Sequence, residues 1–281
     1  MNEILNTILN INQNYLIIVL LVIFFTLEQV STTPFRFKQR GKHLLENSLF
    51  QIVLTGLNIF FVAIQVYSIE WLNAQEIGLF YLVALPFWVK LILGVVLYDL
   101  TTYWVHRASH KVPLLWRLHR VHHSDTTMDS STTLRFHPLE LVLIYQTGNI
   151  VTAGLFGTDV NSMVVYYFII YIFLFLEHSN LRYPKWLNNT LGIVFVMPDH
   201  HRVHHQQEQF YTDSNFADIF IIWDRLFGTF KMMPVEQMKY GLVEFEGEKK
   251  QSFLYLMKSP FIKMKRISSE KPTTEINKSH T

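Results

Sequence analysis

Histidines gather in one part of this 281-residue chain, where eleven of the thirteen lie between positions 106 and 205. Six belong to a motif that occurs twice, His-Arg-Val-His-His, at 119–123 and 201–205, and His106 and His110 precede the first copy. Residues three and four apart share one face of a helix, so each motif can direct two or three imidazoles at one point. Because neutral imidazole is a common ligand of zinc, copper, iron and nickel, this spacing predicts a metal site.

Eight convergent imidazoles exceed what one tetrahedral zinc ion can use, and they suit two metal ions close together. They are His106, His110, His119, His122, His123, His201, His204 and His205. His178 is a further candidate ligand because it ends an apolar segment, where an ionisable side chain is costly. His137 is a weaker candidate, and His200 is expected beside the site instead. Isolated histidines such as His43 are expected to be ordinary surface or core residues.

A ligating imidazole usually donates its second N–H to an acceptor, so nearby carboxylates are candidates for that role. Asp99 lies seven residues before His106, on the same helical face. The other candidates are Asp125, Glu140, Glu177, Asp199 and Asp224. Asp199 also stands where it could cap the helix that carries the second motif.

The composition is that of a membrane protein, with 50% hydrophobic and only 16% charged residues. The net charge of +2 gives no reason to expect nucleic acid as a partner. The chain has no cysteine, which excludes disulfides, iron–sulfur clusters, thiolate-ligated haem, cysteine-type zinc sites and thiol nucleophiles.

Apolar segments predict an all-α integral membrane protein with about four to five membrane helices. Three segments are expected to span the membrane: 15–31, 46–68 and 77–101. Segments 141–157 and 161–177 are short for full spans, which favours a tilted or shallow hairpin, or else a buried hairpin in a cytosolic lobe. Residues 216–230 are aromatic and amphipathic and are expected along the membrane surface.

The distribution of basic residues predicts the orientation. Lys and Arg occur in segments 36–42, 106–135 and 182–239, but not in the N-terminal 14 residues or the links at 69–76 and 157–160. The histidine motifs are therefore expected in a helical catalytic cap on the cytoplasmic side. Residues 1–265 are expected to form one membrane-embedded domain with a histidine core at 95–230, followed by a disordered tail at 266–281.

Taken together, His-x3-His and two copies of His-x2-His-His among membrane spans resemble the fatty acid hydroxylase superfamily, also called the sterol desaturase family. The resemblance extends to Tyr103-Trp104-Val105-His106-Arg107, to Leu115-Trp116-Arg117-Leu118-His119 and to the residues from Pro198 to His205. It covers about positions 95–230. The block from Trp104 to Leu134 is similar to the alkylglycerol monooxygenase branch.

The resemblance implies a membrane di-iron oxygenase that uses O₂ to hydroxylate or desaturate a lipid. The eight motif histidines match the family's metal-binding positions, and His178 falls where the family has a further histidine. Larger members often have another histidine four residues later, where this chain has Arg182. Nine imidazoles, with Asn180 or a water as an extra ligand, are the ligand set that the resemblance implies.

Motifs that the chain lacks indicate a partner and a location. The chain has no flavin, nicotinamide or cytochrome b5-like motif, so the two electrons must come from a separate donor such as cytochrome b5, a ferredoxin or a flavin reductase. The short chain and the absence of targeting signals favour a bacterial inner membrane, with the endoplasmic reticulum as the alternative. The active site is expected on the cytoplasmic side, with a lipid entering from the bilayer.

Alternative functions remain open at this point. Hydroxylase and desaturase chemistry would use the same site, and a sterol, fatty acyl chain, ether lipid, carotenoid or sphingolipid-like molecule could be the substrate. A zinc-dependent membrane hydrolase would need a carboxylate base within the motif, as in His-Glu-x-x-His, and none occurs. A metal-binding or transport protein without catalysis would place ionisable residues along the spans, which carry few.

Overall fold

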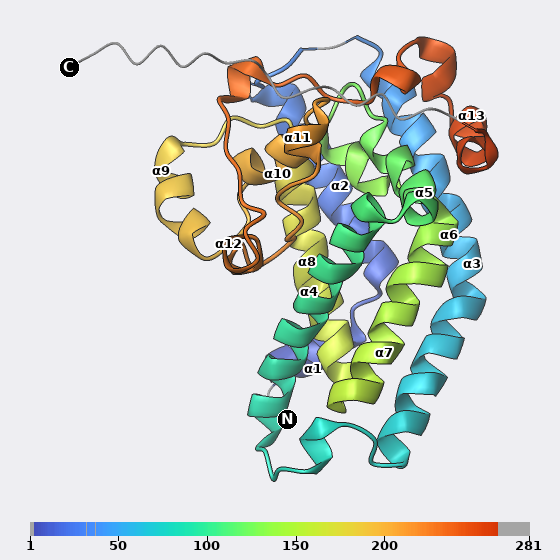
Figure 1. The fold of residues 1–281 in the computed structure, drawn as a ribbon, viewed down its shortest axis with the longest axis vertical. Helices are drawn as coiled ribbons and strands as arrows, with labels where there is room; N and C mark the ends of the chain where they lie inside the picture. Colours follow the sequence, from blue (N-terminus) through green and yellow to red (C-terminus); the bar gives the residue numbers. More distant parts are fainter. Residues whose placement is uncertain (1–2, 32, 37, 264–281) are drawn as a thin grey trace.

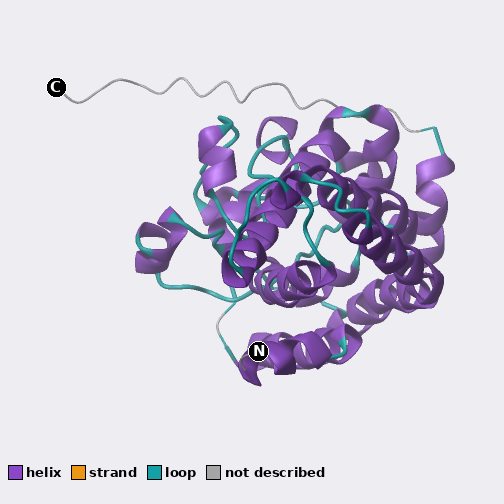
Figure 2. Ribbon diagram, turned by 90° about the horizontal axis from the view of Figure 1, so that it is seen from below, coloured by secondary structure: helices purple, strands orange, loops and turns teal. Residues whose placement is uncertain are grey.

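The computed structural model describes residues 3–31, 33–36 and 38–263. Within these ranges the chain is helical, and β-structure is limited to two isolated bridges, as Figure 2 shows by its lack of strands. The predicted all-α class is confirmed. The tail expected to be disordered, at 266–281, lies outside the described residues.

Five helical segments are long and apolar enough to cross a membrane, which makes the chain an integral membrane protein. They run along the long axis of the molecule in Figure 1. The five comprise α2 (Gln13–Val30), α3 (Arg40–Ala74), α4 (Phe87–Lys111), the segment Pro138–Phe156 and α8 (Val160–His178).

The helix of the third predicted span, α4, starts later than the sequence suggested. Residues 77–86 form a connection that contains the short turn η1 (Leu79–Tyr81), and Pro86 is the N-cap of α4. As a result, α4 continues past the predicted end of the span and carries His106 and His110 in its last two turns.

The two segments predicted for the shallow hairpin, 141–157 and 161–177, were too short, because both helices start before the positions expected. Pro138 occupies the first turn of a helix, where its missing N–H costs nothing. The segment comprises α6 (Pro138–Glu140), the π-turn η3 (Leu141–Tyr145) and α7 (Gln146–Phe156). With α8, it gives two candidate spans of 19 residues each.

Helix packing places α8 against α2 and α4, and α3 against α7. Buried Tyr98 and Tyr166 stack at 5.9 Å between α4 and α8, within an apolar core that also includes Ile69 of α3. The outer surface carries exposed apolar side chains, such as Ile59 on α3 and Ile92 on α4, which are 81% and 61% exposed. Such surface is stable against lipid rather than water.

Two helices that begin with proline carry the repeated motif above the bundle. After α4 ends, Pro113 starts α5 (Pro113–His123), and Pro198 starts α10 (Pro198–His204). The expectation that Asp199 caps α10 was wrong. Met197 is the N-cap, and Asp199 lies in the first turn, where it pairs with Arg202 at 2.9 Å.

Residues 216–230, expected as an amphipathic segment along the membrane surface, are mostly irregular and partly buried. Only α12 (Ile222–Leu226) is helical there, while Phe216, Ile219 and Ile221 are fully buried rather than spread on a membrane surface. The carboxylate of Asp224 accepts hydrogen bonds from the backbone N–H groups of Phe216 and Ala217 at 2.8 and 2.9 Å, which holds the preceding segment as a loop.

Candidate metal centre

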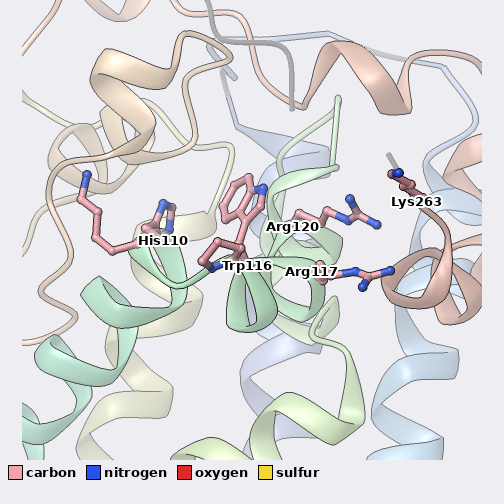
Figure 3. Close-up of a pocket in the computed structure, with 7 residues that line it drawn as sticks. His110, Trp116, Arg117, Arg120 and Lys263 are labelled. Atoms are coloured by element: carbon pink, nitrogen blue, oxygen red, sulfur yellow. The ribbon is translucent and has the colours of Figure 1, made fainter. Parts of the chain in front are cut away.

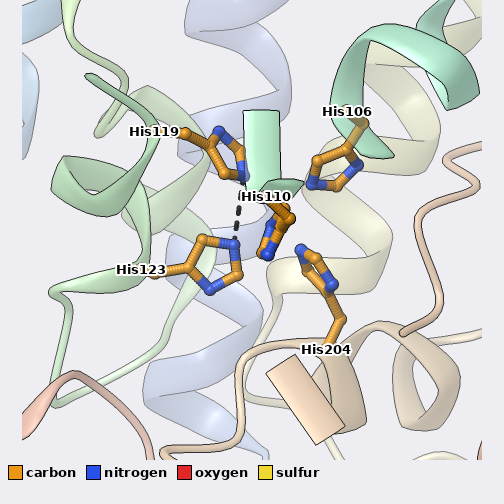
Figure 4. A group of neighbouring side chains, drawn as sticks. All are labelled: His106, His110, His119, His123 and His204. Atoms are coloured by element: carbon orange, nitrogen blue, oxygen red, sulfur yellow. Dashed lines mark hydrogen bonds between the residues drawn. The ribbon is translucent and has the colours of Figure 1, made fainter. Parts of the chain in front are cut away.

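One group of histidines unites α4, α5 and α10. One ring nitrogen from each member lies within 4.8 Å of those of the others, and all the side chains are buried. Figure 4 shows the rings around a common centre, with His119 and His123 opposite His106 and His204. The members are His106, His110, His119, His123 and His204.

A second group unites α5, α8 and the end of α10, and comprises His122, His178, His201 and His205. Their Nε2 atoms approach in series at 3.0–3.1 Å, from His122 through His178 and His201 to His205. All four are buried. His178, the candidate from the end of the last span, thus belongs to this group.

The two groups adjoin each other. Between the groups, the ring centroid of His123 lies 4.6 Å from that of His205, and that of His204 lies 5.3 Å from that of His201. The structure therefore brings all nine histidines named from the sequence to one place, divided into five and four. Their role as metal ligands stays a prediction.

Backbone carbonyls fix the orientation of several rings. Three Nδ1–H groups donate to carbonyl oxygens: His106 to Phe216 at 2.8 Å, His204 to Ser214 at 2.6 Å and His178 to Leu174 at 2.7 Å. A ring that donates from Nδ1 keeps Nε2 as the free ligand atom. The Nε2 atoms of His106 and His204 are buried without a hydrogen-bond partner in the described part of the chain.

Carboxylates contact the outer side of other rings, as the sequence suggested for Glu140 and Glu177. His119 donates from Nδ1 to Glu140 at 2.6 Å. Glu177 lies 3.7 Å from Nδ1 of His201 and 3.9 Å from Nδ1 of His178, and its buried oxygens have no hydrogen-bond partner among the described residues. These contacts can orient rings and make them better donors to a metal.

Two aspartates beside the centre were missed from the sequence. Asp213 lies 3.4 Å from Nδ1 of His110, and Asp218 lies 3.9 Å from Nδ1 of His106. Asp218 also comes close to Glu177 and His201. Both aspartates occupy the irregular segment between α11 (Gln209–Thr212) and α12, where no periodicity marks a buried position.

Burial keeps the imidazoles uncharged. It lowers the pKa of His119 to about 3. It also holds the pKa of His122, His123, His201, His204 and His205 well below the ordinary value, and the neighbouring imidazoles add to the effect. Neutral imidazole is the form that binds metal. Several of these buried nitrogens face one another, and there are too few N–H groups for each to form a hydrogen bond. Burying unpaired nitrogens is unfavourable, and bound metal ions would give them partners.

Two other candidate histidines lie outside both groups. His137 is the N-cap of α6: its Nδ1 accepts from the N–H of Leu139 and its Nε2 donates to the carbonyl of Met257, both at 3.3 Å. Nδ1 of His200 accepts from the N–H of Met197 at 3.2 Å. Both have structural roles here.

Some of the candidate acceptors named from the sequence also bond to residues outside the two histidine groups. Asp99 accepts from the indole of Trp223 at 2.7 Å, and the side chain of Asn180 donates to the carbonyl of Phe35 at 2.8 Å, so these hydrogen bonds join both side chains to residues outside the histidine groups. Asp125 contacts His43 at 2.9 Å, which makes His43 a satisfied core residue.

Glu140 offers a direct test of the outer contacts. We expect Glu140→Ala to lower metal affinity about 10- to 100-fold, because the ring of His119 loses its acceptor. Glu140→Gln keeps an acceptor oxygen and should lose less. Chelator competition measures the affinity, with exposed Glu236 changed to Ala as the control. Equal affinity in Glu140→Ala and the parent would contradict a role for this contact.

The fold and the site define a class: an all-helical membrane protein with a buried, histidine-rich candidate metal centre. The model of the family described as fatty acid hydroxylase matches residues 91–229, which span both motifs. The chain belongs to the fatty acid hydroxylase superfamily, and the resemblance seen in the sequence is confirmed.

Relatives of known activity agree with this assignment. The chain is 32% identical to alkylglycerol monooxygenase of Homo sapiens over 162 residues, 55% of this chain and 33% of that protein. It is 30% identical to the Danio rerio alkylglycerol monooxygenase over 224 residues, 73% of this chain and 45% of that protein. It is 27% identical to the ornithine lipid hydroxylase OlsE of Rhizobium tropici over 189 residues, 66% of this chain and 55% of that protein.

The matched region is thus only about a third to a half of these relatives' length. No solved structure matches the chain.

Proposed function

We propose that the protein is a membrane di-iron oxygenase that uses O₂ and external electrons to hydroxylate a C–H bond of a lipid. The observation that carries this proposal is the division of nine buried, converging histidines into adjoining groups of five and four. An all-nitrogen donor set of this size suits two imidazole-binding metal ions. The matched relatives are named as a monooxygenase and a lipid hydroxylase, which favours hydroxylation over desaturation.

The donor set fits iron. Two irons would supply the oxidising power, drawn from O₂, that an unactivated C–H bond requires. In this proposal the five-histidine group holds one iron, and the group of His122, His178, His201 and His205 holds the other. The donors include no thiolate that such an oxidant could destroy, because the chain lacks cysteine.

The surrounding residues act on the ligands. Four rings donate a hydrogen bond from Nδ1–H to the carbonyls of Phe216, Ser214 and Leu174 and to the carboxylate of Glu140. Nε2 of each of these rings is then left to bind a metal ion. Burial excludes water and keeps the imidazoles neutral. The centre is therefore arranged to bind metals before a substrate arrives.

The reaction needs a partner. Hydroxylation inserts one atom of O₂ into the lipid and releases the other as water, which consumes two electrons and two protons. We assign the electrons to a separate donor, such as cytochrome b5, a ferredoxin or a flavin reductase. We further propose that residues 1–265 act as one domain in a bacterial inner membrane. The centre is assigned to the cytoplasmic side because the basic segments 106–135 and 182–239 contain the histidine motifs.

Metal content and product mass test the proposal. Protein purified in detergent should contain two irons per chain, and iron-loaded protein given reductant and lipid should consume O₂ and yield a product heavier by one oxygen atom. A product lighter by two hydrogens would indicate the desaturase alternative. Zinc alone, with no lipid-dependent O₂ uptake after reconstitution with iron, would contradict an oxygenase and favour the hydrolase or binding alternatives.

A further inference from the structure

A cavity of about 530 Å³ opens beside the five-histidine group. His110 and Trp116 form one side of it. In Figure 3 the indole of Trp116 stands between His110 and two guanidinium groups that point toward Lys263. The ring of Trp116 also lies 5.0 Å from that of His110 and 5.6 Å from that of His123. The wall of the cavity is thus in contact with the candidate metal centre.

The other side of the cavity is cationic, with Lys111, Arg117, Arg120 and Lys263 in its lining. Lys111 is partly neutralised by Asp213 at 2.9 Å. Within residues 3–31, 33–36 and 38–263, the side chains of Arg117 and Lys263 have neither a hydrogen-bond nor an ion-pair partner. Among the described residues, the cavity therefore has two cations that no carboxylate neutralises.

Arg120 is the most deeply buried cation of the cavity lining. It is only 4% exposed, and its Nη2 donates to the backbone carbonyls of Ser259 and Ile262. Its buried Nε has no hydrogen-bond partner among the described residues. The guanidinium of Arg120 therefore places a largely buried positive charge in the wall of the cavity, and such a charge favours an anion as its neighbour.

The surroundings favour an amphiphile over a soluble anion. Lys111 is the last residue of the candidate membrane helix α4, so the cavity lies where a span ends. Val112 and Leu114 alternate along the chain with the lining residues Lys111 and Pro113, and they are 44% and 69% exposed. Cations beside exposed apolar side chains match a molecule with an anionic head and an apolar chain.

We propose that this cavity binds the phosphate headgroup of the lipid substrate and so selects anionic lipids. The inference rests on the proposed hydroxylase function, since it names the substrate class of that site. With the head against Arg117, Arg120 and Lys263, the adjoining part of the lipid lies near Trp116 and the five-histidine group. The cavity then determines both which lipid binds and which of its carbons lies near the centre.

Equilibrium binding to the full chain in nanodiscs tests the proposal. The probes are a lysophosphatidic acid, the uncharged monoacylglycerol with the same chain, and inorganic phosphate. The parent should bind the anionic lipid about tenfold more tightly than the neutral one, the size expected for one charge-assisted interaction. Arg117→Gln combined with Lys263→Gln should remove this preference. Arg182→Gln with Lys185→Gln, which removes the same charges from exposed positions elsewhere, should retain it.

Each outcome decides the question. Equal binding of the charged and neutral lipids by the parent, or an unchanged preference in the cavity variant, overturns the proposal. Displacement of the lysolipid by phosphate at the lysolipid's own concentration assigns the cavity to a free anion and also overturns it. Binding needs no electrons and no turnover, so intact selectivity without hydroxylated product counts against the proposed reaction and leaves the headgroup site standing.

Discussion

Replacing His122 with alanine should reduce the iron content from two to about one per chain and lower product formation by at least about 100-fold. The loss of an outer partner alone typically costs 10- to 100-fold, and a ligand should cost more. His122 belongs to the smaller group, where only His178, His201 and His205 would remain. The larger group would keep all five members, so the proposal expects one iron to be retained.

A matched control separates loss of a ligand from damage to the fold. His200 is buried and directly precedes the second motif, yet its Nδ1 accepts from the N–H of Met197 and takes no part in either group. His200→Asn keeps an acceptor near that position and should retain two irons and turnover. Helix content and melting temperature are compared among all three proteins. Two irons and parental turnover in folded His122→Ala would refute the proposed centre.

The convergence of the nine histidines was predictable in part because helix geometry is local. His106 and His110, or His201 and His205, share a face wherever the helix packs, so spacing alone indicated that they act together. Spacing could not indicate which members belong to which group. His122 and His123 are adjacent on α5, yet they face different groups. That division depends on where α8 and α10 approach α5, which is a property of the tertiary fold.

The outer partners were predictable only in part. Glu140 was named because carboxylates are the expected acceptors, and the structure places it 2.6 Å from His119. The backbone carbonyls of Ser214 and Phe216 hold two other rings, and every residue has a carbonyl, so no residue type indicates this role. The prediction for residues 216–230 was wrong because aromatic side chains can fill a buried loop as readily as they cover a membrane-facing surface.

The predicted boundaries of the spans were wrong for a related reason. The fourth span was predicted to start after Pro138, because proline usually interrupts helices. At the first turn it does not, and the helix gains enough residues to reach a length suited to a membrane. The number of spans was therefore more secure than their limits.

Arg135 should be the residue outside the histidine groups whose loss destabilises the protein most. Its side chain is fully buried, and it donates to the carbonyl of Val121 at 3.3 Å and to Ser124 Oγ at 3.1 Å, both at the end of α5. It also donates to Asn47 on α3 at 3.1 Å and to Gln251 at 2.6 Å. A cation at a helix C-terminus satisfies carbonyls that the helix leaves unpaired.

The charge of Arg135 also stabilises a neighbouring anion. Asp125 is buried, which by itself raises its pKa, but His43 and Arg135 together hold that pKa well below its usual range. Removing the guanidinium therefore leaves several buried acceptors unpaired and an anion with less compensation. Because His122 and His123 lie between Val121 and Ser124, the same bonds fix the end of α5 that carries both histidines into the two histidine groups.

We expect Arg135→Met to lower the free energy of unfolding by about 3–5 kcal/mol, the range for breaking a buried charged network. For a chain of this size the melting temperature should fall by on the order of 10 °C. Arg135→Lys keeps the charge but cannot reproduce a planar group with several fixed donors, so its loss should be intermediate. Exposed Arg182, changed to Met, should stay within about 0.5 kcal/mol of the parent. Thermal unfolding in one detergent compares the four proteins, and an unchanged melting temperature for Arg135→Met would show that this network does not hold α5 to α3.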